Sequence, residues 1–257
     1  MLLVTFAGKL GCYTFSVPRL ALPNTIRFKE TAAARKSAVV LIYDLSNFSR
    51  FANHQGAQRY VPRFINHVSS AIDTIIYGGS PYWTDRDDAY YEPLLAPTHE
   101  KFLGDGGLYI WASADERELV RSTFVLPLCD RLRELRRQFG SIVRRARHDV
   151  PIASRPREIR FGLAMGDVTE LRRRDARQHE YVGACINLAS RLQNYCPGIG
   201  FLASATIGMN EFSGNQNGYA WVTAKHVKGF PREDVIVDRN EYESANPRKR
   251  AAKFMDR

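Results

Sequence analysis

Residues 38–48 read Ala38-Val39-Val40-Leu41-Ile42-Tyr43-Asp44-Leu45-Ser46-Asn47-Phe48. The apolar run that ends at Tyr43 is too short for a typical helix and contains β-branched residues, so it predicts a buried strand. Asp44 follows at the end of this strand, before a short turn that leads into a helix. The segment therefore places a carboxylate at a strand end.

A second aspartate ends another apolar run, in Lys101-Phe102-Leu103-Gly104-Asp105-Gly106-Gly107. Residues 99–103 and 108–111 are expected to form a hairpin around it. Two carboxylates on neighbouring strand ends can bridge two divalent cations about 3.5 to 4 Å apart, the arrangement used for phosphoryl transfer. Taken singly, Asp105 equally suits a hairpin turn and Asp44 suits a helix cap.

The rest of the chain predicts an alternating α/β domain. Apolar residues recur with helical spacing over 55–77, where Pro62 marks the first turn and Gly78 the end. A second helix is expected over 115–139, kinked or split at Pro127, and a third over 184–193. Further strands are expected at 2–6, 13–17, 159–165, 201–205, 219–227 and 234–237.

Three parts of the chain are distinguished by composition. Residues 1–36 form an N-terminal extension without a recognisable motif, and residues 37–240 form the main domain. Within that domain, the polar segment 80–98 is expected to be an insertion or long loop, and 148–156 a linker. Residues 241–257 are highly charged and predict a mobile tail.

Composition excludes several classes of protein. The chain has 257 residues, of which 44% are hydrophobic, enough for a substantial core. No apolar stretch approaches the roughly 20 residues that span a bilayer, and the start lacks the pattern of a secretory signal, so a cytoplasmic location is expected. The four cysteines are widely scattered and suggest neither a zinc knuckle nor a disulfide framework.

The formal charge of +10 predicts attraction of polyanions, with basic clusters at 131–147 and 172–177. These clusters fit either phosphate binding or a solvated helix face. Aromatic residues that would stack bases do not interleave with them, which argues against nucleic acid. A compact triphosphate fits the same charge, and no stable nucleic-acid or membrane partner is expected.

A third informative segment reads Glu180-Tyr181-Val182-Gly183-Ala184-Cys185-Ile186-Asn187-Leu188-Ala189-Ser190-Arg191. Asn187 and Arg191 are four residues apart, so on a helix they project from one face. An amide can orient a sugar oxygen, and a guanidinium can stabilise charge that develops on a transferring phosphoryl group. The structural alternative is a solvent-facing asparagine and an arginine that pairs with a nearby carboxylate.

Five motifs in order resemble the class III nucleotide cyclases, the adenylyl and guanylyl cyclase catalytic domain, over residues 38–238. They are Tyr43-Asp44-Leu45-Ser46-Asn47-Phe48-Ser49, Lys101-Phe102-Leu103-Gly104-Asp105, Arg160-Phe161-Gly162-Leu163-Ala164-Met165-Gly166, the helix with Gly183, Asn187, Ala189, Arg191 and Leu192, and Val227-Lys228-Gly229. The chain departs from the family at 171–177, which is arginine-rich where the family shows a small glycine-rich segment. The resemblance implies an α+β fold with a ferredoxin-like βαββαβ core, in which helices flank an antiparallel-rich central sheet.

The resemblance also implies roles for individual residues. Asp44, Asp105 and the carbonyl of Leu45 would hold two Mg²⁺ or Mn²⁺ ions, and Lys228 would hold the terminal phosphates. Asn187 would position the ribose and Arg191 would stabilise the transition state. Asn47 and Phe48, in the turn after the strand, complete the expected substrate-binding set. In the family the aspartates and the Asn/Arg/Lys set belong to opposite subunits, so a homodimer with two shared sites is implied.

The base is expected to contact Lys101 and Glu180, a donor and an acceptor that suit adenine, cytosine or uracil equally. The chain shows no sensor domain and resembles the free-standing pyrimidine cyclases of bacterial antiphage (Pycsar) signalling, which make cyclic UMP or cyclic CMP for a separate effector protein. UTP or CTP is therefore the expected substrate. A soluble adenylate cyclase that makes cyclic AMP from ATP, and a catalytically silent nucleotide-binding regulator, are the alternatives.

Overall fold

The computed structural model describes residues 2–8, 11–17, 28–29, 34–84, 89–119, 124–172, 179–208 and 218–256. The main-sheet strands are β3 Arg35–Leu45, β4 His99–Phe102, β5 Gly106–Ser113, β6 Ile159–Arg172, β7 His179–Val182, β8 Phe201–Ser204, β9 Tyr219–Val227, β10 Phe230–Asp238 and β11 Phe254–Asp256. The helices are α1 Phe48–Ala52, α2 Val61–Tyr77, α3 Glu116–Leu119, α4 Val125–Arg145, α5 Ala184–Leu192, α6 Arg239–Ser244 and α7 Pro247–Lys253, with single 3-10 turns at Ala57–Arg59 and Ala205–Ile207.

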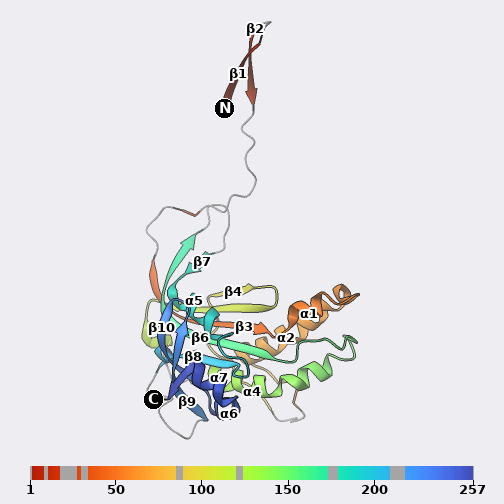
Figure 1. Cartoon of the computed structure of the whole chain (residues 1–257), viewed down its shortest axis with the longest axis vertical. Helices are drawn as coiled ribbons and strands as arrows, with labels where there is room; N and C mark the ends of the chain where they lie inside the picture. The colour runs from red at the N-terminus through yellow and green to blue at the C-terminus, as the bar shows by residue number, and fades with distance from the viewer. Residues whose placement is uncertain are drawn as a thin grey trace.

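One mixed sheet organises the main domain (Figure 1). Its strand order is β11-β9-β10-β8-β6-β3-β5-β4, with β7 paired to the far end of β6. Among the described residues β6 and β8 pair in parallel, and the other neighbours pair antiparallel. This arrangement confirms the expected antiparallel-rich sheet flanked by helices.

The central strand β3 divides the core into two layers because successive side chains point to opposite faces. Val39, Leu41 and Tyr43 pack in the cluster that includes α2 and α4. Val40 and Ile42 pack in the cluster that includes α5. Continuing the alternation places Asp44 on the face covered by α5.

Sequence signals located the first long helix well and the second less well. Pro62 lies in the first turn of α2 and Gly78, at φ 87°, ends it, as predicted. The helix expected over 115–139 is split into α3 and α4, but Pro127 lies inside the first turn of α4. Proline is tolerated there because the amides of a first turn have no intrahelical acceptor. The break therefore precedes Pro127.

The N-terminal extension contains the two strands expected there. β1 Leu2–Gly8 and β2 Gly11–Val17 pair antiparallel with each other. They form a separate two-stranded sheet in the described part of the chain. Most of the remaining residues before β3, and the arginine-rich stretch 173–178, lie outside the described residues.

The C-terminal segment differs from the mobile tail that its charge predicts. Residues 239–256 form α6, α7 and β11, and β11 extends the sheet by pairing with β9. The side chain of Phe254 is 3% exposed and contacts the rings of Tyr195 and Tyr242 edge-on. Burial of these aromatic rings, scattered among the charges, fixes the segment to the sheet.

Replacing Phe254 by alanine is expected to lower the free energy of unfolding by about 3 kcal/mol, because the change removes a buried aromatic side chain and leaves a cavity. Urea denaturation followed by circular dichroism measures this loss. The matched control is Lys249→Ala, an exposed residue on α7. Equal stability of the Phe254→Ala variant and the wild type would show that the segment does not contribute to the core.

The basic cluster at 131–147 is partly internal, which neither sequence interpretation anticipated. Arg133 is 6% exposed, and its Nε donates to Asp238 at 2.7 Å. Arg131 donates to the backbone carbonyls of Ile75 and Glu92. These arginines join α4 to other elements and are therefore not available to a polyanion.

The segment 80–98 contains no helix and no named strand among its described residues, as expected for an insertion. It nevertheless packs against the domain. Trp83 is 2% exposed in the α2–α4 core, and the Tyr91 hydroxyl donates to Glu134 at 2.7 Å.

None of the helices in the described ranges combines the length and the apolar character that a membrane span requires.

Candidate metal and nucleotide site

Asp44 and Asp105 meet at the junction of β3 and β5. Asp44 pairs with Gly106 across the two strands, and the backbone N–H of Leu45 donates to the carbonyl oxygen of Asp105 at 3.0 Å. A Cβ on Gly106 would lie 1.9 Å from the carbonyl oxygen of Tyr43, so only glycine allows this close approach. The hairpin thus carries Asp105 to the strand end that presents Asp44.

The two carboxylates interact directly. Burial raises the pKa of Asp44, the Arg160 guanidinium opposes this shift, and the charge of Asp105 and a hydrogen bond to it add to the increase. Nη2 of Arg160 donates to Asp44 Oδ2 at 2.9 Å, and the two side chains are 20% and 19% exposed. One guanidinium therefore faces two carboxylates, which leaves an excess of negative charge.

This excess fits divalent cations. Mg²⁺ and Mn²⁺ prefer oxygen ligands, and Mg²⁺ is commonly held by one or two carboxylates together with water and substrate phosphates. No group of three or more acidic, histidine or cysteine side chains suited to a metal occurs in the described ranges. The described residues thus bring together two carboxylates here, which is fewer oxygen ligands than such a cation takes.

An Asp105→Asn variant is expected to be more stable than the wild type when metal-free at pH 7.5, by about 1 kcal/mol or about 2 °C in Tm. In the wild type the pKa of Asp44 is raised, so the neutral side chain stabilises the folded state at low pH. This contribution to the free energy of unfolding is lost as the pH rises through the raised pKa. Burial remains the larger cause of the raised pKa, and the variant removes the part of this loss that the charge of Asp105 adds.

The difference in Tm between the Asp105→Asn variant and the wild type should therefore be small below the ordinary pKa of aspartate and grow above the raised pKa of Asp44. Thermal unfolding across pH 3.5–8 measures it, with Asp115→Asn, an exposed aspartate, as control. Added Mn²⁺ should raise the Tm of the wild type alone. A variant less stable than the wild type at pH 7.5 would contradict the proposed repulsion.

Lys101 and Glu180, expected to face the base, lie together although 79 residues separate them. Lys101 Nζ donates to Glu180 Oε2 at 3.0 Å, with the side chains 48% and 25% exposed. Lys101 lies on β4, and Glu180 lies on β7, a strand that the sequence did not predict. The rings of His99 and Tyr181 meet edge-on beside this pair.

Asn187 and Arg191 lie on α5, as predicted, and both are exposed. Lys228 is exposed in the tight turn between β9 and β10. Within the described ranges these three side chains form no hydrogen bond or ion pair, and so none with Asp44 or Asp105. In the described part of the chain, these three side chains therefore have no direct polar contact with the two aspartates.

Asn47 lies in the turn that follows β3, and Phe48 is the first residue of α1. Asn47 adopts the left-handed conformation, with φ 64°, and precedes α1. Phe48 is half-buried and contacts the ring of Phe51, so its ring packs with the core. Asn47 lines a pocket next to the aspartates, and Phe48 supports the turn that holds it.

Sequence reasoning missed two features of this region. Arg160, quoted within a motif, had no assigned role, and it is the partner of Asp44. Arg50, Arg155 and Arg157 line the pocket beside Asn47; Arg155 comes from the segment interpreted as a linker, and Arg157 follows directly after it. The run Arg155-Pro156-Arg157 was the available signal, because two arginines held by a proline in a loop are unusual for a plain connection.

The chain is similar in structure to two nucleotide cyclases. It aligns with the adenylyl cyclase CyaB from P. aeruginosa at a TM-score of 0.55 and 16% identity, over 80% of this chain and 96% of that one. It aligns with the guanylyl cyclase Cya2 at a TM-score of 0.52 and 19% identity, over 81% of this chain and 93% of that one. By sequence, no protein-family model and no curated protein matches it. The chain therefore has the fold of the adenylyl and guanylyl cyclase catalytic domains.

Proposed function

We propose that this protein is a metal-dependent nucleotide cyclase that converts a nucleoside triphosphate into a 3′,5′-cyclic nucleotide and pyrophosphate. The observation that carries the proposal is the placement of Asp44 and Asp105 at adjoining strand ends in a cyclase fold, with the backbone of Leu45 bonded to that of Asp105. Two carboxylates that face one another with one arginine partner suit a site for cations and phosphates.

Asp44, Asp105 and the Leu45 carbonyl would hold two Mg²⁺ or Mn²⁺ ions, which when bound supply charge neutralisation and lower the pKa of the ribose 3′-hydroxyl. The Arg160–Asp44 ion pair must share or release its carboxylate for this to happen. In the free protein Arg160 offsets part of the negative charge, and during turnover it stays within reach of the phosphates.

The remaining residues align the substrate and neutralise charge, which is most of what phosphoryl transfer needs from a protein. The 3′-oxygen forms a bond to the α-phosphorus as its proton leaves, and the bond from that phosphorus to the pyrophosphate oxygen breaks. Asn187 would orient the ribose, Arg191 would stabilise the α-phosphoryl group, and Lys228 would hold the terminal phosphates. Their exposed side chains, without partners in the described structure, are free to bind a ligand.

Two copies would share two active sites, with the aspartates of one subunit opposite Asn187, Arg191 and Lys228 of the other. The support is that, among the described residues of one chain, the two sets form no hydrogen bond or ion pair with each other. Phe102, Leu103 and Val182 are 59%, 45% and 50% exposed, and they lie next to the Lys101–Glu180 pair. Exposed apolar side chains around a polar pair favour a contact surface between subunits.

The base would be read by Lys101 and Glu180, which must turn from each other toward the ligand. A pyrimidine nucleotide, UTP or CTP, is the substrate we propose, with cyclic UMP or cyclic CMP acting on a separate effector protein in antiphage defence within the cytoplasm. A lysine donor and a carboxylate acceptor also suit adenine, and the similarity to CyaB favours an adenylate cyclase as the second candidate.

The decisive experiment incubates the full-length protein with ATP, GTP, CTP or UTP, each with Mn²⁺ or Mg²⁺, and identifies products by mass spectrometry. Cyclic UMP or cyclic CMP is the expected product. Cyclic AMP would make the protein an adenylate cyclase instead. Nucleotide binding by calorimetry without any cyclic product, in every metal and nucleotide combination, would favour a regulatory protein in which Arg160 permanently occupies Asp44.

A further inference from the structure

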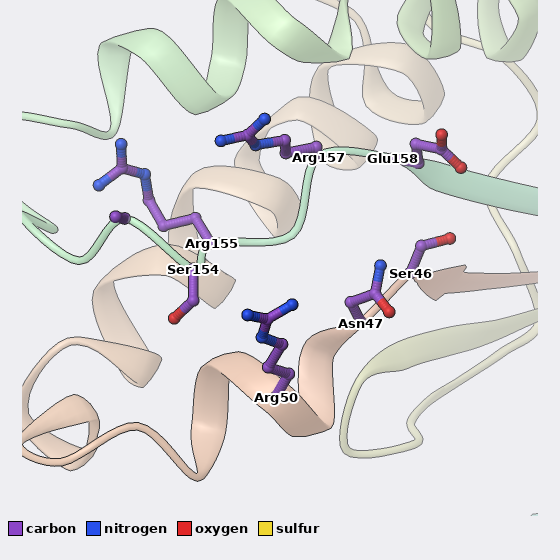
Figure 2. Close-up of a pocket in the computed structure, with 8 residues that line it drawn as sticks. Ser46, Asn47, Arg50, Ser154, Arg155, Arg157 and Glu158 are labelled. Carbon is purple, nitrogen blue, oxygen red and sulfur yellow. The ribbon is translucent and has the colours of Figure 1, made fainter.

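Beside the aspartates lies a pocket of about 520 Å³ with an unusual lining. Three arginines, Arg50, Arg155 and Arg157, line it together with Ser46, Asn47, Ala153, Ser154 and a single carboxylate residue, Glu158. Figure 2 shows Arg50 rising from α1 on one side and the segment that carries Arg155 and Arg157 on the other. The pocket is therefore positively charged, and two chain segments distant in sequence form it.

The three arginines of this pocket outnumber its one carboxylate. The side chains of Arg50 and Arg157 form no ion pair or hydrogen bond within the described ranges. Arg155 donates from Nη1 to the carbonyl oxygen of Val150, while its Nε is buried without a partner. Burial and the positive charges of Arg147 and Arg157 lower the pKa of the Arg155 guanidinium. Such crowding of like charges is unfavourable unless an anion binds between them.

A second buried polar atom points to the same conclusion. The hydroxyl oxygen of Ser154 is buried, and it too has no hydrogen-bond partner. Buried polar atoms are rarely left unsatisfied, so Ser154 Oγ and Arg155 Nε would gain hydrogen bonds if these side chains turned toward an anion in the pocket. Guanidinium groups bind phosphate oxygens through paired, charge-assisted hydrogen bonds.

Both chain segments that line the pocket lead directly to the paired residues Asp44 and Arg160. Ser46 and Asn47 follow Asp44 directly along the chain, and the backbone N–H of Ser46 donates to the carbonyl oxygen of Glu158 at 3.0 Å. Glu158 in turn lies two residues before Arg160, the partner of Asp44. A ligand with a phosphate at the aspartates can thus extend further phosphates into the pocket.

We infer that Arg50, Arg155 and Arg157 bind the β- and γ-phosphates of the nucleoside triphosphate and retain the pyrophosphate when it leaves. The inference rests on the proposed function and adds three binding residues from the same subunit as the aspartates. The pocket would select triphosphates over monophosphates, and it would make pyrophosphate a competitive inhibitor.

The test is isothermal titration of metal-free, full-length protein with inorganic pyrophosphate. Arg157→Ala and Arg50→Ala should each weaken binding about tenfold, since each removes a charge-assisted hydrogen bond to phosphate. Arg157→Lys should recover part of the affinity. The matched control, Arg232→Ala with Arg248→Ala, removes two exposed arginines elsewhere and should change affinity by less than about twofold at 150 mM salt.

Thermal unfolding of each variant checks that it is folded. Arg157→Ala is expected to disturb folding least, because Arg157 is exposed and has no partner in the described structure. Unchanged pyrophosphate affinity in folded Arg157→Ala and Arg50→Ala would overturn the inference. So would pyrophosphate binding that does not compete with a nucleoside triphosphate, because the pocket would then be a separate site.

These measurements do not depend on turnover. If the protein forms no cyclic nucleotide but pyrophosphate binding depends on the arginines, the proposed reaction fails while the phosphate pocket stands. If cyclic nucleotide forms and Arg157→Ala leaves both KM and pyrophosphate affinity unchanged, the reaction stands and the pocket inference fails.

Discussion

Replacing Asp105 by alanine is expected to lower the rate of cyclic nucleotide formation by about 10³-fold or more. Metal-assisted charge neutralisation contributes several kcal/mol to such a reaction, and each 1.4 kcal/mol corresponds to about tenfold in rate. Without Asp105 the site keeps only the carboxylate of Asp44, which already forms an ion pair with Arg160. Product formation by mass spectrometry at saturating Mn²⁺ measures the loss.

The control for this substitution is Asp115→Ala, which removes an exposed aspartate beyond the opposite end of β5 from Asp105 and should leave the rate unchanged. Circular dichroism establishes that the Asp105→Ala variant is folded. If the variant kept more than about a tenth of the wild-type rate, Asp105 would have no role in metal binding and the proposed site would be wrong.

Mixing two inactive variants is expected to restore activity. Asp105→Ala and Arg191→Ala should each be almost inactive alone, because every shared site then lacks one group. In a mixed dimer one of the two sites combines an intact Asp105 with an intact Arg191. With random pairing half of the dimers are mixed, so about a quarter of wild-type activity should return.

The control mixture combines Asp44→Ala with Asp105→Ala. Both changes fall in the same half of the site, so no mixed dimer has a complete site and activity should stay at the level of the single variants. The comparison needs subunit exchange, which a gentle unfolding and refolding of each mixture provides. Equal activity in both mixtures would show that the aspartates and Arg191 act within one subunit.

Local patterns in the sequence predicted most of the central architecture. The apolar run before Asp44 formed β3, the helical spacing before Gly78 formed α2, and the Gly-Asp-Gly-Gly segment formed a hairpin. These elements depend on neighbours in the chain, so periodicity and turn residues describe them. The prediction that Asp44 and Asp105 lie close together followed from assigning each of them to the end of one of two neighbouring strands.

The C-terminal segment shows where such reasoning fails. Its charge predicted a mobile tail, but Tyr242 and Phe254 are 8% and 3% exposed beneath it. A few aromatic side chains buried against β9 outweigh the solvation of the surrounding lysines and arginines, whose charged ends stay in water. Composition averages over these residues and therefore missed the contact.

By itself, then, the sequence determined the strand, the helix and the hairpin that present Asp44 and Asp105, because those elements arise from interactions along a short stretch of chain. Only the tertiary structure decided what surrounds them: Arg160 on Asp44, Glu180 on Lys101, and the arginines of the pocket beside Asn47. Apart from Arg50, which is close to Asn47 in the chain, these neighbours lie more than 75 residues apart, and sheet register and packing bring them together. A charged side chain does not reveal its partner until the fold has placed both.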